Sequence, residues 1–310
     1  MKLDLSNRGL TTLQGIDFPD NVTELNINYN QLTSLEHCPQ DLQILMCSYN
    51  QLTSLQYCPN KIKVLYCDHN QLTSLQYCPR DLEELNCLKN ILTSLQYCPI
   101  NLKNLFCSKN LLTSLQYCPI NLNYLDCRSN QLTSLIYCPT NLQSLSCDHN
   151  QISSFQYFPE NLQVIGCSGN QLTSLQYCPE NVQELYCGSN QLTSLQYCPK
   201  NVQELWCNNN LLTSLQYCPK NIKILWCNNN LLTSLEHCPE SLKVLFCDSN
   251  QLTSLKYCLQ RLNCNNNMLI SLQDCPESLK KLWYDNNPLS PEYQNKSLNE
   301  IKLRHLRCLI

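Results

Sequence analysis

Cysteine and histidine are the side chains of this sequence with the most chemistry available to them. The 310 residues include 25 Cys and 5 His, but only 3 Trp and 5 Gly. Cysteine at this density suits a disulfide framework, a metal site, or a nucleophile activated by a nearby base. The spacing of the cysteines along the chain decides among these three chemistries.

The cysteines form two columns that share a 20-residue period. One column runs from Cys47 through Cys247 to Cys264, and the other lies before or near a proline, from Cys38 to Cys275. If each 20-residue repeat forms one coil of a stack, cysteines at equivalent positions have Cβ atoms about one coil, or about 4.8 Å, apart. This is farther than the roughly 3.8 Å that a disulfide prefers. Phe158 replaces one cysteine, which indicates a slot for apolar volume. We expect small buried hydrophobes in a reducing compartment, and a thiol count would reveal the alternative, a disulfide framework.

The spacing of the cysteines and histidines does not match that of metal-binding or catalytic sites. Neighbouring cysteines are nine or eleven residues apart, except Cys258 and Cys264 in a shortened copy, whereas zinc sites need clustered ligands. His69 and His149 share a phase but lie four coils apart, about 19 Å at 4.8 Å per coil. No nucleophile–base pair with a supporting third group and no Gly-rich phosphate loop is present. We therefore expect no metal, no cofactor and no enzymatic activity.

An asparagine recurs at the same period and defines the repeat. It is found every 20 residues from Asn30 to Asn250, and then at Asn267 and Asn287 after the shortened copy. Each copy reads Pro-x-x-Leu-x-x-Leu-x-Cys-x-x-Asn-x-Leu-x-x-Leu-x-x-Cys. We count 15 copies, and we divide the chain into a repeat solenoid over 1–290 and a C-terminal cap over 291–310.

The repeat predicts one short strand per coil. Leu45-Met46-Cys47 alternates between apolar and variable positions, which is the period of a strand. Twenty residues leave no room for a helix, so the return side is expected to be extended, polyproline-like or a tight turn beginning near Pro39. Parallel stacking at about 4.8 Å per coil then turns the leucines and cysteines inward. The side chain of Asn50 is expected to join its neighbours in a hydrogen-bonded ladder.

The motif Leu-x-x-Leu-x-Cys-x-x-Asn-x-Leu resembles the leucine-rich repeat. Its length and its Pro-x-x-Leu start resemble the bacterial subclass of YopM-like and IpaH-like effectors. The resemblance implies a curved solenoid with short parallel strands on a concave face that binds other proteins. The chain departs in using Cys where Val or Ile is common, and it lacks both an N-terminal helical cap and room for a ubiquitin-ligase domain. The Asn-rich, Ala-free composition also fits a giant virus of amoebae or an intracellular pathogen.

All three tryptophans occupy the middle position of the predicted strands. This position faces outward on the concave sheet, where an aromatic stripe forms beside two carboxylates. Exposed aromatics at such a place are typical of binding hot spots. The alternatives are a self-stabilising cross-strand ladder and a contact between copies of the chain. The candidate protein-binding residues are Tyr186, Trp206, Trp226, Phe246, Glu184, Glu204 and Trp283.

Two further features concern the return side and the ends. The tyrosine that precedes Cys-Pro in most copies, such as Tyr57, is expected to stack along the return side. A capping box at Ser297 and Glu300 predicts a short helix from about 298 to 309 that covers the end of the core, or else docks a partner. The front end has no such cap, so self-association through this N-terminal edge is expected.

Composition narrows the function classes. The net charge of −3 provides no basic footprint for nucleic acid, and no apolar run reaches the roughly 20 residues that span a membrane. Met1 leads directly into the first copy, without a signal peptide, so we expect a cytoplasmic protein. We expect a non-catalytic scaffold or host-directed effector that binds host proteins through the concave face. The alternatives are a substrate-recognition adaptor of a ubiquitin ligase or other enzyme complex, and an extracellular receptor, which would need disulfides.

Overall fold

Each copy of the repeat folds into one coil that contains a three-residue strand. The structure is a computed structural model and describes residues 1–156, 158–255, 259–273, 275 and 278–308. The central residue of most strands is fully buried, as for Leu45, because its side chain points away from the open face. The residues on either side of it face outward and are partly exposed in most strands.

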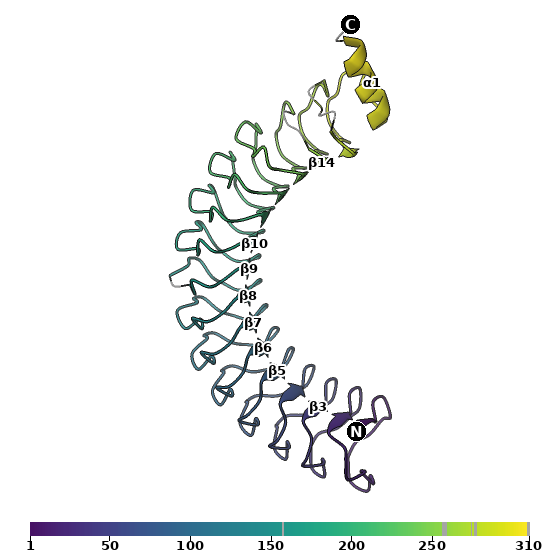
Figure 1. The fold of residues 1–310 in the computed structure, drawn as a ribbon, viewed down its shortest axis with the longest axis vertical. Helices are drawn as coiled ribbons and strands as arrows, with labels where there is room; N and C mark the ends of the chain where they lie inside the picture. The colour runs from purple at the N-terminus through teal and green to yellow at the C-terminus, as the bar shows by residue number, and fades with distance from the viewer. Residues whose placement is uncertain (157, 256–258, 274, 276–277, 309–310) are drawn as a thin grey trace. The chain divides into compact units, whose positions relative to one another are not determined.

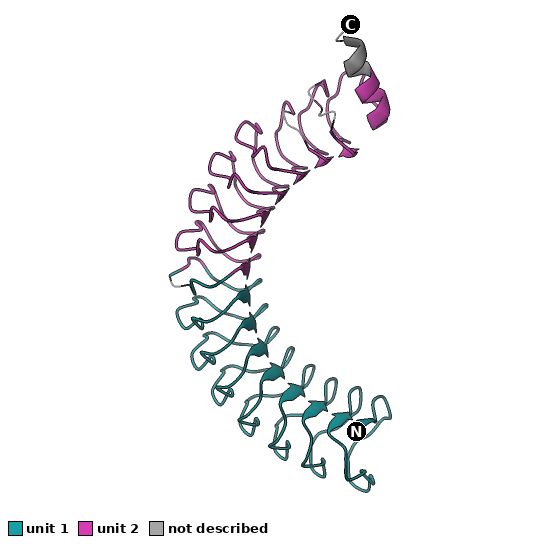
Figure 2. Cartoon of the chain, viewed as in Figure 1, with its two compact units in different colours: residues 1–152, 156–162 teal, residues 153–155, 163–310 magenta. Residues whose placement is uncertain are grey.

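The chain folds into two compact units (Figure 2). Unit 1 comprises residues 1–152 and 156–162, and its neighbouring strands pair in parallel and in register. Within unit 1 the strands line the inner side of the curve, and turns form its outer side (Figure 2). Its strands are β1 (Lys2–Asp4), β2 (Glu24–Asn26), β3 (Ile44–Met46), β4 (Val64–Tyr66), β5 (Glu84–Asn86), β6 (Asn104–Phe106), β7 (Tyr124–Asp126) and β8 (Ser144–Ser146).

Unit 2 comprises residues 153–155 and 163–310 and is built in the same way. Its strands again pair in parallel along the inner side of the unit, and a C-terminal helix, α1, follows them (Figure 1). Its elements are β9 (Val164–Gly166), β10 (Glu184–Tyr186), β11 (Glu204–Trp206), β12 (Ile224–Trp226), β13 (Val244–Phe246), β14 (Arg261–Asn263), β15 (Lys281–Trp283) and α1 (Leu298–Cys308).

The core consists of parallel columns of leucine and cysteine. In one representative coil, Leu42, Leu45, Cys47, Leu52 and Leu55 are all 0% exposed, so the predicted inward columns are confirmed. The return side contains no helix or strand within the described residues. The shortened copy keeps its place in the sheet, because its strand β14 pairs in register with β13 and β15. The three missing residues are therefore absorbed on the return side.

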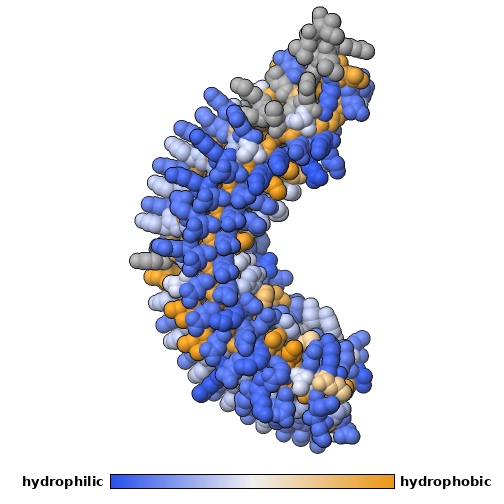
Figure 3. Space-filling model, viewed as in Figure 1, coloured by the Kyte–Doolittle hydropathy of each residue, from blue (hydrophilic) through white to orange (hydrophobic). Residues whose placement is uncertain are grey.

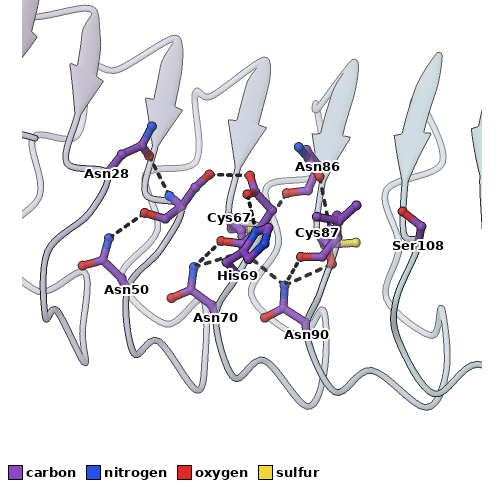
Figure 4. Close-up of polar contacts among 12 residues, drawn as sticks. Asn28, Asn50, Cys67, His69, Asn70, Asn86, Cys87, Asn90 and Ser108 are labelled. Carbon is purple, nitrogen blue, oxygen red and sulfur yellow. Dashed lines mark hydrogen bonds and ion pairs between the residues drawn. The ribbon is translucent and has the colours of Figure 1, made fainter. Parts of the chain in front are cut away.

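A buried asparagine ladder joins each coil to its neighbours, as the sequence predicts (Figure 4). Asn70 Nδ2 donates to the carbonyl of Cys67 in its own coil and to that of Cys47 in the preceding coil, both at 3.0 Å. Asn70 Oδ1 accepts the backbone N–H of Leu52 at 2.9 Å. One side chain thus bonds to buried backbone groups of two coils, and it supplies the acceptor for the buried N–H of Leu52.

Helix α1 ends the described chain and begins at the predicted capping box. The backbone N–H and the hydroxyl of Ser297 both donate to Glu300 Oε2 at 2.7 Å, and the N–H of Glu300 donates to Ser297 Oγ at 3.3 Å. These hydrogen bonds to its ionised form lower the pKa of the Glu300 carboxyl. Ile301 is 1% exposed and Lys302 Nζ donates to the carbonyl of Leu279, which fixes the helix on the last coils. No helix in the described part of the chain has the length and apolarity required to cross a membrane.

Candidate functional site

The predicted aromatic stripe lies on the open face of unit 2. The register of β10 to β13 pairs Tyr186 with Trp206, Trp206 with Trp226, and Trp226 with Phe246. Their neighbours in each strand, such as Leu205, are fully buried, so the rings point to the opposite face. Trp206 is 36% exposed and Trp283 is 40% exposed, which leaves both indoles accessible from solvent.

These rings pack on one another in sequence along unit 2. Ring centroids are 5.2 Å apart between Tyr186 and Trp206, in an edge-on arrangement. They are 4.8 Å apart between Trp206 and Trp226 and 4.0 Å apart between Trp226 and Phe246, with interplanar angles of 26° and 17°. We call Tyr186, Trp206, Trp226, Phe246 and Trp283 the aromatic ladder. The faces of the stacked rings pack against each other, so a partner would contact the ring edges.

Trp283 joins the ladder across an intervening strand. Its ring centroid is 6.2 Å from that of Phe246, although β14 lies between their strands. The contact is possible because β14 carries Asn263 at this position, whose amide turns aside to donate to Asp248 Oδ1 at 3.0 Å. Sequence reasoning saw an unbroken stripe of four rings, and the structure extends the contact to the fifth.

The two predicted carboxylates accept hydrogen bonds from side chains of the ladder itself. Tyr186 donates its phenolic O–H to Glu184 Oε2 at 2.7 Å, and Trp206 donates its indole N–H to Glu204 Oε1 at 2.8 Å. Partial burial and the hydrogen bond to Glu184 raise the pKa of the Tyr186 phenol. Each carboxylate thus satisfies the polar group of the ring two residues later on its own strand.

A basic margin borders the ladder from β12 to β15, and sequence reasoning missed it. Directly before β12, β13 and β15, lysines stand where copies such as those of Gln183 and Gln203 have glutamine, and the first residues of β14 and β15 are themselves cations. All of these cations are exposed, and none takes part in an ion pair within the described residues. Comparing copies at these two phases, rather than only at the tryptophans, would have revealed the margin. Its members are Lys223, Lys243, Arg261, Lys280 and Lys281.

The return side of unit 1 presents a different surface. Tyr57, Tyr77 and Tyr97 are 51–57% exposed, and no ring contact joins the tyrosines of this row that the structure describes. The prediction that they stack is therefore wrong for these residues. Their φ angles of 67–69° place them in the left-handed region, which directs each ring into solvent. The three tyrosines line a groove of about 1270 Å³ with Arg80 and Ile100, and hydrophobic side chains reach the surface on the outer side of this unit (Figure 3).

One polar cluster in unit 1 combines serine, aspartate and histidine. The Ser48 hydroxyl donates to Asp68 Oδ1, and His69 Nδ1 lies 2.9 Å from Asp68 Oδ2 (Figure 4). The carboxylate sits between the other two groups, so the imidazole is not placed to take the serine proton. Among the described residues, no group of three or more His, Cys, Asp or Glu side chains is arranged to hold a metal ion.

Both cysteine columns are composed of free thiols in the described chain. The strand column is 0% exposed from Cys47 to Cys264, which confirms its role as buried apolar volume. Burial raises the pKa of these thiols, to about 12 for Cys87 and Cys187. They are therefore protonated and unreactive at neutral pH.

No protein-family model and no curated protein matches the chain, but many solved structures do. YopM from Yersinia enterocolitica is similar with a TM-score of 0.80 and 30% identity, over 93% of this chain and 65% of YopM. The functional domain of InlJ from Listeria monocytogenes, which includes a cysteine ladder, is similar with a TM-score of 0.69 and 27% identity, over 80% of this chain and 59% of that one. This chain thus spans about three fifths to two thirds of the length of both proteins.

A leucine-rich repeat protein of Leptospira interrogans matches over 99% of this chain and 93% of its own length, with a TM-score of 0.71. Its identity of 23% supports the fold alone. The 20-residue period, the inward leucine and cysteine columns, the asparagine ladder and these neighbours agree. The chain is a leucine-rich repeat solenoid, similar in fold to YopM and the internalins.

Proposed function

We propose that this chain is a non-catalytic scaffold that binds a protein partner through the aromatic ladder of unit 2, and that it acts as a host-directed effector. The observation that carries the proposal is a row of five aromatic side chains on an open sheet face, each ring in contact with the next. Aromatic side chains bury about 150–250 Å² each when covered, and they dominate the energetics of protein interfaces. The effector role is proposed by analogy with YopM, which has a similar fold and is described in Yersinia pestis as a leucine-rich effector protein.

The exposed ladder has a physical consequence for the free protein. Contiguous apolar surface of several hundred Å² is rare on a monomer without a binding role. Stacking satisfies the ring faces of Trp206, Trp226 and Phe246, but it leaves their edges open on the concave side. A partner that covers these edges gains their burial at little entropic cost, because neighbouring rings already hold each side chain in place.

The compartment and the partners complete the proposal. We place the protein in the reducing interior of a host cell, since free thiols throughout the described chain suit that environment. Host proteins are its proposed partners. Self-association through the N-terminal edge strand β1 stays a prediction.

The test compares wild type with the Trp206→Ala/Trp226→Ala double variant in affinity capture from host cytosol. We expect the variant to lose a partner that wild type retains, with unfolding temperature measured in parallel. Tyr57→Ala/Tyr77→Ala removes two exposed rings from unit 1 and is the matched control. Unchanged capture with lowered thermal stability would mean that the ladder only stabilises the sheet.

Two further outcomes identify the alternatives. Recovery of ligase subunits together with the partner would favour the adaptor role over a simple scaffold. Loss of a dimer in the double variant, measured by sedimentation, would show that the ladder joins two copies of this chain.

A further inference from the structure

The geometry of the ladder restricts how a partner can bind. Trp226 stacks between Trp206 and Phe246, with ring centroids 4.8 and 4.0 Å away. A base or ring inserted between two of these side chains would require them to be about 7 Å apart, since each stacked contact takes about 3.5 Å. The partner therefore meets ring edges, which carry the positive end of the aromatic quadrupole and favour anionic oxygens.

The repeat itself shows which group an indole N–H of this ladder takes. In β11, Trp206 donates to the carboxylate of Glu204, two residues earlier on the same strand. The next coil keeps the tryptophan, Trp226, but has Ile224 at the position of the glutamate. In β15 the corresponding pair is Lys281 and Trp283.

Two indole donors are consequently left without a carboxylate. Within the described residues, neither Trp226 nor Trp283 donates its N–H to a protein group. An indole N–H is a donor only, so each can be satisfied by water or by an acceptor from a partner. The coil in which Trp206 meets Glu204 provides the pattern for that acceptor, which is a carboxylate.

The basic margin adds charge at the same strands. Arg261 pairs in register with Lys281, so these like charges are neighbours. The backbone N–H of Arg261 also donates to the carbonyl of Lys243, the residue directly before β13. From β12 to β15 there are three steps of about 4.8 Å, so the cations extend over about 14 Å. An extended peptide of roughly five residues has this length. Uncompensated cations along one side of the ladder attract an acidic segment.

We propose that β12 to β15 bind an acidic, apolar segment of a partner protein. Its carboxylates accept the N–H groups of Trp226 and Trp283 and pair with the basic margin, while its apolar side chains cover the ring edges. The inference rests on the proposed function and specifies the chemistry of the partner. Single-stranded nucleic acid also carries anions, but it binds by stacking bases on ring faces, and Trp226 uses both of its faces on Trp206 and Phe246.

The test measures fluorescence anisotropy of labelled ten-residue peptides with the full chain. One peptide alternates Glu and Leu, a second replaces every Glu by Lys, a third replaces every Glu by Gln, and an oligo-dT strand is the nucleic-acid arm. We expect the Glu peptide to bind at least about tenfold more tightly than the others, and its affinity to fall with added salt.

Three variants locate the interaction. Lys243→Glu/Lys281→Glu is expected to weaken the Glu peptide at least about tenfold, since two attractions become repulsions. Trp226→Phe keeps a ring but removes the N–H, and Ile224→Glu supplies an internal carboxylate like that of Glu204, so both are expected to weaken binding several-fold. The matched control is Lys103→Glu, an exposed cation in unit 1 at the same phase as Lys243, which should leave binding unchanged. Native near-UV circular dichroism confirms that each variant is folded.

The inference is overturned if the Glu peptide fails to bind, binds no more tightly than the Lys peptide, or binds more weakly than oligo-dT. It is also overturned if the charge reversals have no larger effect than Lys103→Glu. In any of these cases, loss of a captured partner in Trp206→Ala/Trp226→Ala would still support protein binding by the ladder. The two proposals can therefore fail separately.

Discussion

Replacement of Asn210 by alanine tests the asparagine ladder where the environment is best defined. Its Oδ1 accepts the backbone N–H of Leu192 at 2.9 Å. Its Nδ2 donates to the carbonyls of Cys187 and Cys207 at 3.1 Å and to that of Asn208 at 3.2 Å. Asn210 is 6% exposed, so water does not readily replace these bonds.

The backbone groups that bond to Asn210 differ in whether they keep another hydrogen-bond partner in Asn210→Ala. The carbonyl of Cys187 also accepts from Asn190, and that of Cys207 also accepts from Asn230, so both keep one donor. The N–H of Leu192 loses the acceptor that this side chain supplies. An unsatisfied buried group costs about 1–3 kcal/mol, and loss of the shared bonds adds about 1 kcal/mol. We expect Asn210→Ala to lower the free energy of unfolding by about 2–4 kcal/mol.

Urea unfolding followed by tryptophan fluorescence measures this loss, because all three tryptophans lie in unit 2 with Asn210. Gln216→Ala is the control, since that side chain is exposed on the return side of the same coil. A free energy within about 0.5 kcal/mol of this control, at an unchanged m-value, would refute the reasoning. It would mean that water or a backbone shift satisfies the N–H of Leu192.

Two other predictions concern alkaline pH and the exposed tyrosines. Burial raises the pKa of the Cys187 thiol from 9.0 to about 12. Between these two values the folded chain keeps a proton that the unfolded chain releases. The contribution of this thiol to the free energy of unfolding is therefore complete below pH 9 and is lost as the pH rises toward 12. The free energy of unfolding in urea should fall less steeply between pH 9 and 11 in Cys187→Ala, by about 1.4 kcal/mol per pH unit for the missing thiol. Equal slopes in the two proteins would contradict this. Tyr97→Gly relieves a left-handed conformation that costs about 1–2 kcal/mol, against about 0.5–1 kcal/mol of added backbone entropy. We expect thermal unfolding of Tyr97→Gly to show a free energy of unfolding higher by up to about 1 kcal/mol. The control Gln96→Gly should show only the entropic loss of stability. Equal losses in both variants would indicate that the Tyr97 ring stabilises the fold.

The repeat geometry could be predicted from the sequence because the period is uniform. When one coil follows another at a constant step, residues 20 apart become neighbours, as the pairing of Trp206 with Trp226 shows. The inward columns and the ladder that includes Asn50 follow from the same regularity. The capping box at Ser297 is likewise local, so its hydrogen bonds agree with the pattern.

The candidate site was predictable in position but not in its chemistry. The sequence located the rings on one face, and it placed Glu204 beside Trp206 without showing that the two are hydrogen-bonded. The contact between Phe246 and Trp283 depends on how the shortened copy is absorbed and on which way Asn263 turns. Neither can be seen in a pattern that records only residue type and phase.

The sequence by itself determined the solenoid, its core columns and the strand position of every tryptophan, because strict repetition converts spacing along the chain into neighbours in space. Only the tertiary structure decided that Tyr97 turns outward, and that among the described residues the indole N–H groups of Trp226 and Trp283 have no acceptor and the cations beside the ladder form no ion pair. Those features depend on backbone dihedrals, side-chain rotamers and the distances between charges, which become definite only when the coils are stacked.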